Sequence, residues 1–158
     1  MNPANVRVKS ALAEKSIPCE ITYLEHDTRT SAQAAETLGC SISQIAKSLI
    51  FATGDGGAVL AVTSGGNRVR TDLLADVVGK SIGKANADFV RQKTGFVIGG
   101  VAPVGIASPI QTVFDQDLFA HEVVWAAAGT PNTLFPISIS DLYTLAGDRI
   151  YDFTEPLA

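Results

Sequence analysis

Apolar residues recur at helical spacing in five segments of the chain, and residues that favour helix ends flank them. Asn2 and Pro3 favour a helix start before the first segment. An alanine-rich segment has a serine cap and ends on Gly39, which suits the left-handed conformation at a helix end. The last helix has Ser138 or Ser140 as its cap. The expected helices are residues 3–16, 31–39, 71–79, 86–95 and 138–147.

Shorter apolar or alternating runs predict strands between these helices. Two of them flank the turn Gly54-Asp55-Gly56-Gly57, which indicates a hairpin. Two others flank Gly129-Thr130-Pro131-Asn132 and are expected to pair in the same way. The expected strands are residues 19–25, 47–54, 57–65, 111–114, 122–128 and 133–138.

The order of these elements predicts the fold class. Helices and hairpins are mixed, and the regular strand–helix alternation of a doubly wound parallel sheet is missing. No repeat or linker interrupts residues 1–158, a length that suits one core. We therefore predict a single α+β domain with a mixed, largely antiparallel sheet flanked by helices.

Composition narrows the possible partners. Apolar residues make up 46% and charged residues 18%, which is ordinary for a globular protein. The formal net charge is −4 and the pI is near 5.0. A broad basic face for nucleic acid is therefore not expected, because such binding depends on many phosphate contacts. A grip on a few phosphates at the end of a nucleic-acid strand stays compatible with this charge.

The chain shows no signal for a membrane or for secretion. No apolar stretch is long enough to span a bilayer, and the N-terminal residues are polar. Cys19 and Cys40 form neither a CxxC pair nor a framework, so free thiols in a reducing compartment are expected. We predict a cytoplasmic protein.

Several common catalytic motifs are absent from the sequence. It contains no phosphate-binding glycine motif, no GxSxG elbow and no Cys/His cluster with metal spacing. The only histidines are His26 and His121. We therefore expect no cofactor and no metal, and an enzyme of this sequence would depend on positioning and fixed dipoles.

Lys47 is an unusual residue at the start of the apolar run IAKSLIF, residues 45–51. Lysine is almost never fully buried without a partner. Lys47 therefore either lies at the solvent-facing end of the strand or points into a cleft that receives an anionic ligand.

Residues 99–105, GGVAPVG, combine three glycines and a proline. Glycine allows the backbone to approach a ligand closely, and successive N–H groups can hold an ester or carboxylate oxygen. A tight connection between a helix and a strand is the plainer interpretation. The same two interpretations apply to AAAGTPNTLF, residues 126–135.

Three stretches in this order carry a resemblance to a known family. They are EHDTRTSAQAAETLGCSISQIAKSLIF, FVRQKTGFVIGGVAPVG and VVWAAAGTPNTLFPISISDL. Over roughly residues 3–146 the chain resembles the YbaK/prolyl-tRNA-synthetase-associated family of aminoacyl-tRNA deacylases, in its free-standing, trans-editing form. The resemblance implies hydrolysis of the ester of mischarged tRNA, chiefly tRNA for proline. It also implies a role for the substrate's own ribose hydroxyl and a water molecule rather than a protein nucleophile.

The resemblance also implies site residues. Lys47 matches the catalytic lysine of the family. The GxxxP loop, which lies against the aminoacyl group, matches Gly99 to Pro103. The resemblance places the implied substrate-binding residues at Gly99, Gly100, Val101, Ala102, Pro103, Gly105, Gly129, Thr130 and His26. His26 alone could equally be a hydrogen-bonded structural residue.

The pocket residues and the basic residues suggest which substrate is taken. Ala102 and Ala126–Ala128 stand where some family members carry hydroxyl side chains, which favours alanine or 2-aminobutyrate and leaves cysteine and serine open. Prolyl-tRNA synthetase is a possible partner. The densest group of basic residues is the best candidate for acceptor-stem phosphates: Arg68, Arg70, Lys80, Lys84, Arg91 and Lys93.

Two other functions are compatible with the same residues. One is a binding module for aminoacyl-tRNA or a synthetase that has lost turnover. The other is a small-molecule esterase, whose activity would be insensitive to the tRNA. An intact Lys47 and GxxxP loop favour the tRNA-editing enzyme.

Overall fold

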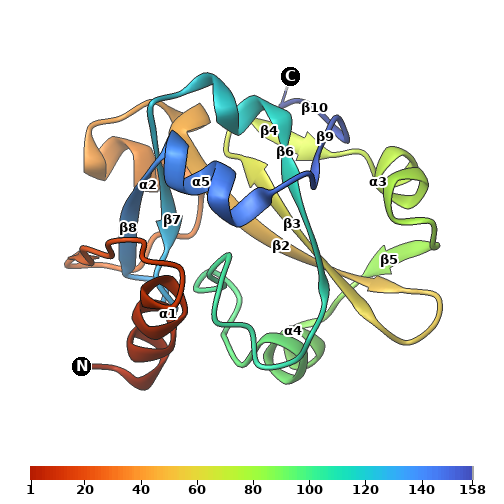
Figure 1. The fold of residues 1–158 in the computed structure, drawn as a ribbon, viewed down its shortest axis with the longest axis horizontal. Coiled ribbons are helices and arrows are strands. Elements are labelled where there is room, and N and C mark those ends of the chain that lie inside the picture. Colours follow the sequence, from red (N-terminus) through yellow and green to blue (C-terminus); the bar gives the residue numbers. More distant parts are fainter. Residues whose placement is uncertain (158) are drawn as a thin grey trace.

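The computed structural model describes residues 1–157 as one α+β domain built around an eight-stranded mixed sheet (Figure 1). The sheet order is β1-β8-β7-β2-β3-β6-β9, with β5 paired to β2, and β10 pairs with β4 in a second, two-stranded sheet. The strands are β1 (Thr22–Tyr23), β2 (Ile45–Thr53), β3 (Ala58–Ser64), β4 (Asn67–Val69), β5 (Ile82–Lys84), β6 (Gln111–Asp115), β7 (Val123–Ala127), β8 (Thr133–Ser138), β9 (Ile150–Tyr151) and β10 (Thr154–Pro156).

Both parallel and antiparallel pairs occur in the large sheet. The hairpins β2–β3 and β7–β8 are antiparallel, as the turn residues predict. The pairs β2–β7, β3–β6 and β6–β9 are parallel. The pairs β1–β8 and β2–β5 are also antiparallel, so antiparallel pairs outnumber parallel ones and the prediction of a mixed, largely antiparallel sheet is confirmed.

The helices begin and end close to the predicted positions. Asn2 caps the first helix through its side chain, Ser138 caps the last, and Gly39 and Gly95 end helices in the left-handed conformation. The helices are α1 (Pro3–Ala13), α2 (Ser31–Leu38), α3 (Thr71–Val78), α4 (Ala87–Thr94) and α5 (Ile139–Ala146), with short 3-10 helices η1 (Ile42–Gln44) and η2 (Gln116–Ala120).

Three details of the prediction were wrong. The cap of α2 is Thr30, whose hydroxyl accepts from the Gln33 N–H, rather than Ser31. Residues 19–25 form a strand only at β1, because only this pair of residues reaches the edge of β8. The strands β4, β5, β9 and β10 were not predicted, since strands of two or three residues are too short to show a period.

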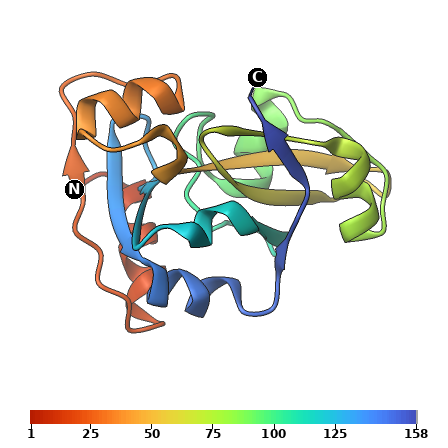
Figure 2. The same cartoon turned by 90° about the horizontal axis from the view of Figure 1, so that it is seen from above.

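Helices cover both faces of the sheet and give it three buried clusters. α1, α4 and α5 pack on one face against β2, β3 and β6, with Leu60 and Phe114 at the centre. α3 packs on the other face with Phe153, and α2 packs there against Ile45 and Leu134. Figure 2 shows α2 in orange and α5 in blue on opposite sides of the molecule.

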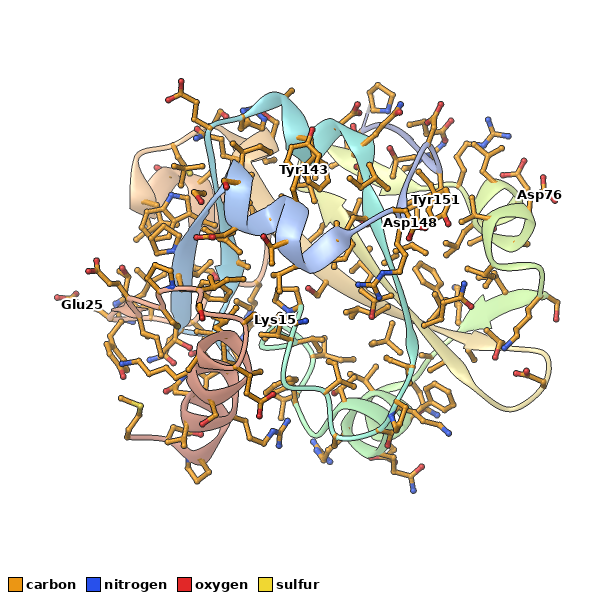
Figure 3. The ribbon with its side chains drawn as sticks, in the orientation of Figure 1. Lys15, Glu25, Asp76, Tyr143, Asp148 and Tyr151 are labelled. Atoms are coloured by element: carbon orange, nitrogen blue, oxygen red, sulfur yellow. The ribbon has the colours of Figure 1, made fainter. Side chains whose placement is uncertain are left out.

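The helix α5 is tied to the chain that leads into β7. Tyr143 extends from α5 toward η2, and its ring centroid lies 4.5 Å from that of Phe119 (Figure 3).

None of the helices described for residues 1–157 combines the length and the apolar character that crossing a bilayer requires.

Candidate functional site

A pocket of about 690 Å³ lies where the central sheet divides. β2 pairs with β7 only through Ile45 and Ala46, and then with β5 only from Phe51 onward. Between these two pairings, residues 47–50 have a neighbouring strand on one side alone, β3. The open edge of this segment lines the pocket, together with α2, β5 and the loop after α4.

Backbone groups of β2 face this pocket without a strand partner. The Ile45 carbonyl accepts from Gly65 N–H at 2.7 Å and the Thr53 N–H donates to the Gly57 carbonyl at 3.0 Å, so odd-numbered residues of β2 turn their peptide groups toward β3. Peptide groups alternate along a strand, so those of Ser48 and Ile50 turn toward the open edge. Buried peptide groups require hydrogen-bond partners, which here must come from water or a ligand.

The side chain of Ser48 adds a further unused group at this edge. Its hydroxyl oxygen is buried, and no described residue forms a hydrogen bond with it. The residue itself lines the pocket. An unpaired buried hydroxyl costs free energy, so it too indicates a position that a ligand or water completes.

Lys47 lies in the wall of the same pocket. Its side chain is half-buried, and its ammonium donates to the backbone carbonyl of Asn67 at 2.5 Å. Burial lowers the pKa of Lys47, and the nearby carboxylate of Asp115 raises it in part. One of the three ammonium protons is engaged, so two remain for a ligand.

The pocket is cationic although the protein is acidic. Among the described residues, those that line it include Arg29, Lys47 and Lys84 and no Asp or Glu. No ion pair of the described residues involves any of these three side chains. Three cations without an ion-pair partner in one concave site, in a chain of net charge −4, create a local positive potential. The site therefore favours an anionic ligand.

The two predicted loops meet beside the pocket. A Cβ added to Gly100 would lie 2.8 Å from the Cα of Thr130 and 2.9 Å from the carbonyl oxygen of Gly129, so these backbones touch. Gly99 adopts φ +89° and stands against Pro131. Only glycine at position 100 permits this contact between the two backbones. The loops are far apart in the sequence, so sequence analysis did not predict the contact.

Helix α1 holds the far end of the first loop. Arg7 donates through its guanidinium to the carbonyls of Gly105 at 3.2 Å, Thr94 at 3.0 Å and Gly95 at 3.4 Å. The same guanidinium stacks on the ring of Phe96, 4.3 Å from its centroid. Figure 1 shows this loop between α1 and α4. One arginine therefore joins α1, the end of α4 and the loop.

The structure places some of the predicted loop residues at the pocket and others behind it. Gly99 and Val101 line it. The N–H of Gly100 is used within the loop, where it donates to the Val97 carbonyl at 3.0 Å. The remaining predicted loop residues do not line the pocket: Gly100, Ala102, Pro103, Gly105, Gly129 and Thr130.

The inference of an apolar pocket from four alanines is weaker than the sequence indicated. Ala102, Ala126 and Ala128 belong to the buried core beside α1 and α5. Ala127 alone among them lines the pocket. Successive residues of a strand point to opposite faces, so a run of alanines cannot all face one ligand.

His26 lies away from the main pocket. It is exposed and lines a separate hollow of about 400 Å³ with Glu25, Asp27 and Glu36. The main pocket has no histidine among its described lining residues. A role for His26 in binding the aminoacyl group is therefore not supported by its position.

The two cysteines are also outside the pocket. Both are free and partly buried, and burial raises the pKa of each thiol. A raised pKa leaves a thiol protonated and weakly nucleophilic at neutral pH. Within residues 1–157 no group of three or more His, Cys, Asp or Glu side chains is placed to hold a metal ion.

Most of the predicted phosphate-binding residues are paired with carboxylates. Arg68 pairs with Glu155, Arg70 with Asp72, Lys80 with Asp55 and Arg91 with Asp88. Lys84 is the member of this group that reaches the pocket.

Sequence reasoning also missed Arg29 and Ser48. Arg29 belongs to the short polar stretch before α2, and that position is its only signal in the sequence.

Comparison with known proteins finds chains that are similar to this one in sequence and in structure. A solved structure of a proposed trans-editing enzyme for prolyl-tRNA synthetase has a TM-score of 0.89 and 37% identity, covering 98% of this chain and 99% of that one. The uncharacterized protein YwhH of Bacillus subtilis is 29% identical over 84% of each chain. EbsC of Enterococcus faecalis, a proposed deacylase of Cys-tRNA(Pro) and Cys-tRNA(Cys), is 22% identical over 81% of this chain and 79% of its own.

A family model agrees with these similarities. The model of the aminoacyl-tRNA editing domain matches residues 25–145, a span that includes the whole of β2, the loop after α4 and the β7–β8 hairpin. That span is well over half of the chain, so the protein belongs to the aminoacyl-tRNA editing domain family.

Proposed function

We propose that this protein is a trans-editing hydrolase that deacylates mischarged aminoacyl-tRNA, with tRNA for proline carrying a small amino acid as substrate. The observation that carries the proposal is the cationic pocket without carboxylates, at the open edge of β2, in an otherwise acidic member of the editing family. Alanine, 2-aminobutyrate, cysteine and serine are the candidate amino acids.

The pocket has groups suited to ester hydrolysis. In this reaction the oxygen of a water molecule bonds to the ester carbonyl carbon, the bond to the ribose oxygen breaks, and that oxygen takes up a proton from the water. Negative charge develops on the carbonyl oxygen. The backbone N–H groups of Gly99 and Val101 donate to no described residue, so they are available to that oxygen.

Lys47 would supply the cationic group beside the terminal nucleotide. Its two unengaged ammonium protons can bind a ribose or phosphate oxygen, and Arg29 and Lys84 can bind further phosphate oxygens. The described lining residues include serine and threonine hydroxyls but no Cys, and no His, Asp or Glu that could activate a hydroxyl as a base. This lining supports attack by water that the substrate's own ribose hydroxyl assists.

The proposal is tested by measuring deacylation of tRNA for proline charged with alanine, cysteine, serine, 2-aminobutyrate or proline. We expect rapid hydrolysis of one or two non-cognate esters while prolyl-tRNA is spared. Absence of hydrolysis of every ester, with prolyl-tRNA synthetase also present, would contradict catalysis and favour the non-catalytic binding module.

A second measurement separates the tRNA enzyme from a small-molecule esterase. Editing should weaken steeply as salt increases, because phosphate contacts release counterions. Equal hydrolysis of a free aminoacyl-adenosine ester and the charged tRNA, with no salt dependence, would favour the esterase.

A further inference from the structure

Behind Lys47, and outside the pocket, lies a polar cluster, buried at Asn67 and Asp115, that the proposed chemistry does not use. It consists of Asn67, Asp115, Asp117 and Thr154. In Figure 1 their strands β4, β6 and β10 come together near the C-terminus. Asn67 is the centre of the cluster, because its side-chain amide donates to the other three residues. Its backbone carbonyl accepts a hydrogen bond from the Lys47 ammonium.

Asp115 is fully buried, and only neutral groups bind it. Its Oδ2 accepts from the Ser64 N–H at 3.1 Å and from Asn67 Nδ2 at 3.0 Å. Its Oδ1 accepts from the Asp117 N–H at 3.0 Å and from the Thr154 hydroxyl at 3.3 Å. These four donors therefore give both oxygens of the buried carboxylate hydrogen-bond partners.

No ion pair among the described residues includes Asp115. A buried charge without a cationic partner is expensive, and an asparagine could fill a purely structural role at lower cost. The cation on which its field acts is Lys47, whose own burial disfavours the charged form. The buried charge of Asp115 therefore favours the protonated form of Lys47.

We propose that Asp115, acting through Asn67, is a positioning residue for Lys47 that holds its ammonium against the Asn67 carbonyl and keeps it charged at the pocket wall. The Asn67 amide, fixed by Asp115, determines where that backbone carbonyl points. The field of Asp115 then opposes the loss of the ammonium proton. This inference rests on the proposed function for its catalytic consequence but not for its effect on the ammonium.

The chain provides a matched control for this proposal. Asp117 also accepts from the Asn67 amide, at 2.8 Å, but it is exposed. Asp117→Asn and Asp115→Asn each remove one negative charge from a carboxylate that accepts from the Asn67 amide. The exposed charge is screened by water, whereas the buried one is not. The other charged groups of the pocket, Arg29 and Lys84, are unchanged in both variants.

The decisive measurement is the NMR titration of the Lys47 ammonium and its adjacent methylene in protein with isotopically labelled lysine. We expect its midpoint to move to lower pH in Asp115→Asn and to move much less in Asp117→Asn. Equal midpoints in the wild type and Asp115→Asn would overturn the proposal. Because no substrate is present, this result does not depend on the deacylation reaction.

Activity then tests the catalytic consequence. In Asp115→Asn we expect kcat to fall by about 10- to 100-fold with little change in KM, since misplacing a catalytic group by about 1 Å can cost about 10²-fold. If Asp115→Asn does not fold, Asn67→Ala removes the amide link and keeps the backbone carbonyl. A normal Lys47 titration together with normal kcat in Asn67→Ala would equally overturn the proposal.

Discussion

Lys47 shows at the scale of one residue how a strand can carry a charge into a pocket. It pairs with Thr63 of β3, and both Ala46 before it and Leu49 two residues after it are apolar. The ammonium is accommodated because a backbone carbonyl and a buried carboxylate offset part of the desolvation. The protonation of Lys47 therefore depends on these neighbouring groups, and substitutions of them test that dependence.

Lys47→Ala should reduce kcat/KM for deacylation by about 100-fold or more, the usual loss when one electrostatic contact to the transition state is removed. The fold should be retained, because no ion pair is broken. Lys80→Ala is the matched control, since Lys80 pairs with Asp55 away from the pocket. Near-normal deacylation by Lys47→Ala would remove this residue from the mechanism.

The lowered pKa of Lys47 also predicts a pH dependence of stability. The folded state binds the proton of Lys47 less tightly than the unfolded chain does, so the protein gains stability as pH rises from the lowered pKa to the ordinary value of 10.5. Lys47→Met should therefore have the higher free energy of unfolding at pH 7, and its advantage should shrink over that window. Denaturant unfolding of both proteins at several pH values measures it, and a constant difference would contradict it.

The close contact between the two pocket loops requires that Gly100 has no side chain. Gly100→Ala would place a methyl carbon 2.8 Å from a backbone atom of Thr130, which cannot move aside as a side chain can. We expect a loss of about 1–3 kcal/mol in the free energy of unfolding, as for other overpacked sites. Gly66→Ala is the control, because its nearest contact would be an ordinary 3.7 Å. Equal stabilities of the two variants would show that the loops can separate freely.

At the scale of elements, the division between β2 and β7 creates the site. Two strands that pair at Ile45 and Ala46 and then separate leave a gap that the α4–β6 loop borders with Gly99 and Val101. Arg7 of α1 fixes this loop to the end of α4. A helix far from the pocket thus contributes to the shape of its wall.

Arg7→Ala should release the loop that follows α4. It removes hydrogen bonds from a charged donor to the partly buried carbonyls of Thr94 and Gly105, each worth about 1.5–3 kcal/mol. We expect faster amide hydrogen exchange in residues 95–106 and a lower kcat. Arg91→Ala, which breaks a pair with Asp88 on the exposed side of α4, should change neither. Unchanged exchange in Arg7→Ala would show that the loop holds its shape by itself.

For the whole molecule, the distribution of charge matters more than its total. The net charge of −4 disfavours nonspecific attraction to nucleic acid, while the pocket collects Arg29, Lys47 and Lys84. Much of the remaining basic surface is neutralised by adjacent carboxylates. Such a protein would bind the end of a tRNA rather than its length.

Arg29→Glu and Lys84→Glu should each weaken tRNA binding and reduce the slope of log affinity against log salt by about 1, the value for one phosphate contact. Lys80→Glu changes charge equally outside the pocket and should leave the slope nearly unchanged. Fluorescence titrations with tRNA for proline at several salt concentrations give these slopes. A larger loss in Lys80→Glu would return the phosphate contacts to the basic residues around α3 and α4.

The sequence by itself determined what local periodicity and local chemistry control. The caps Asn2 and Ser138, the turn after Thr53 and the hairpin at Gly129 act within a few residues, so the major helices and strands and the fold class followed from them. The motifs around Lys47 and Gly99 also identified two parts of the pocket wall, because they are contiguous in the chain.

Only the tertiary structure decided which of these residues share a pocket. The pocket opens where β2 separates from β7. Segments far apart in the sequence meet around it through the contact of Gly100 with Thr130 and the hydrogen bond from Arg7 to Gly105. The buried link from Asp115 through Asn67 to Lys47 joins β6, β4 and β2 in the same way. Such contacts depend on register and packing between strands, which no local pattern contains. The same packing leaves His26 and most of the alanines out of the lining of the pocket.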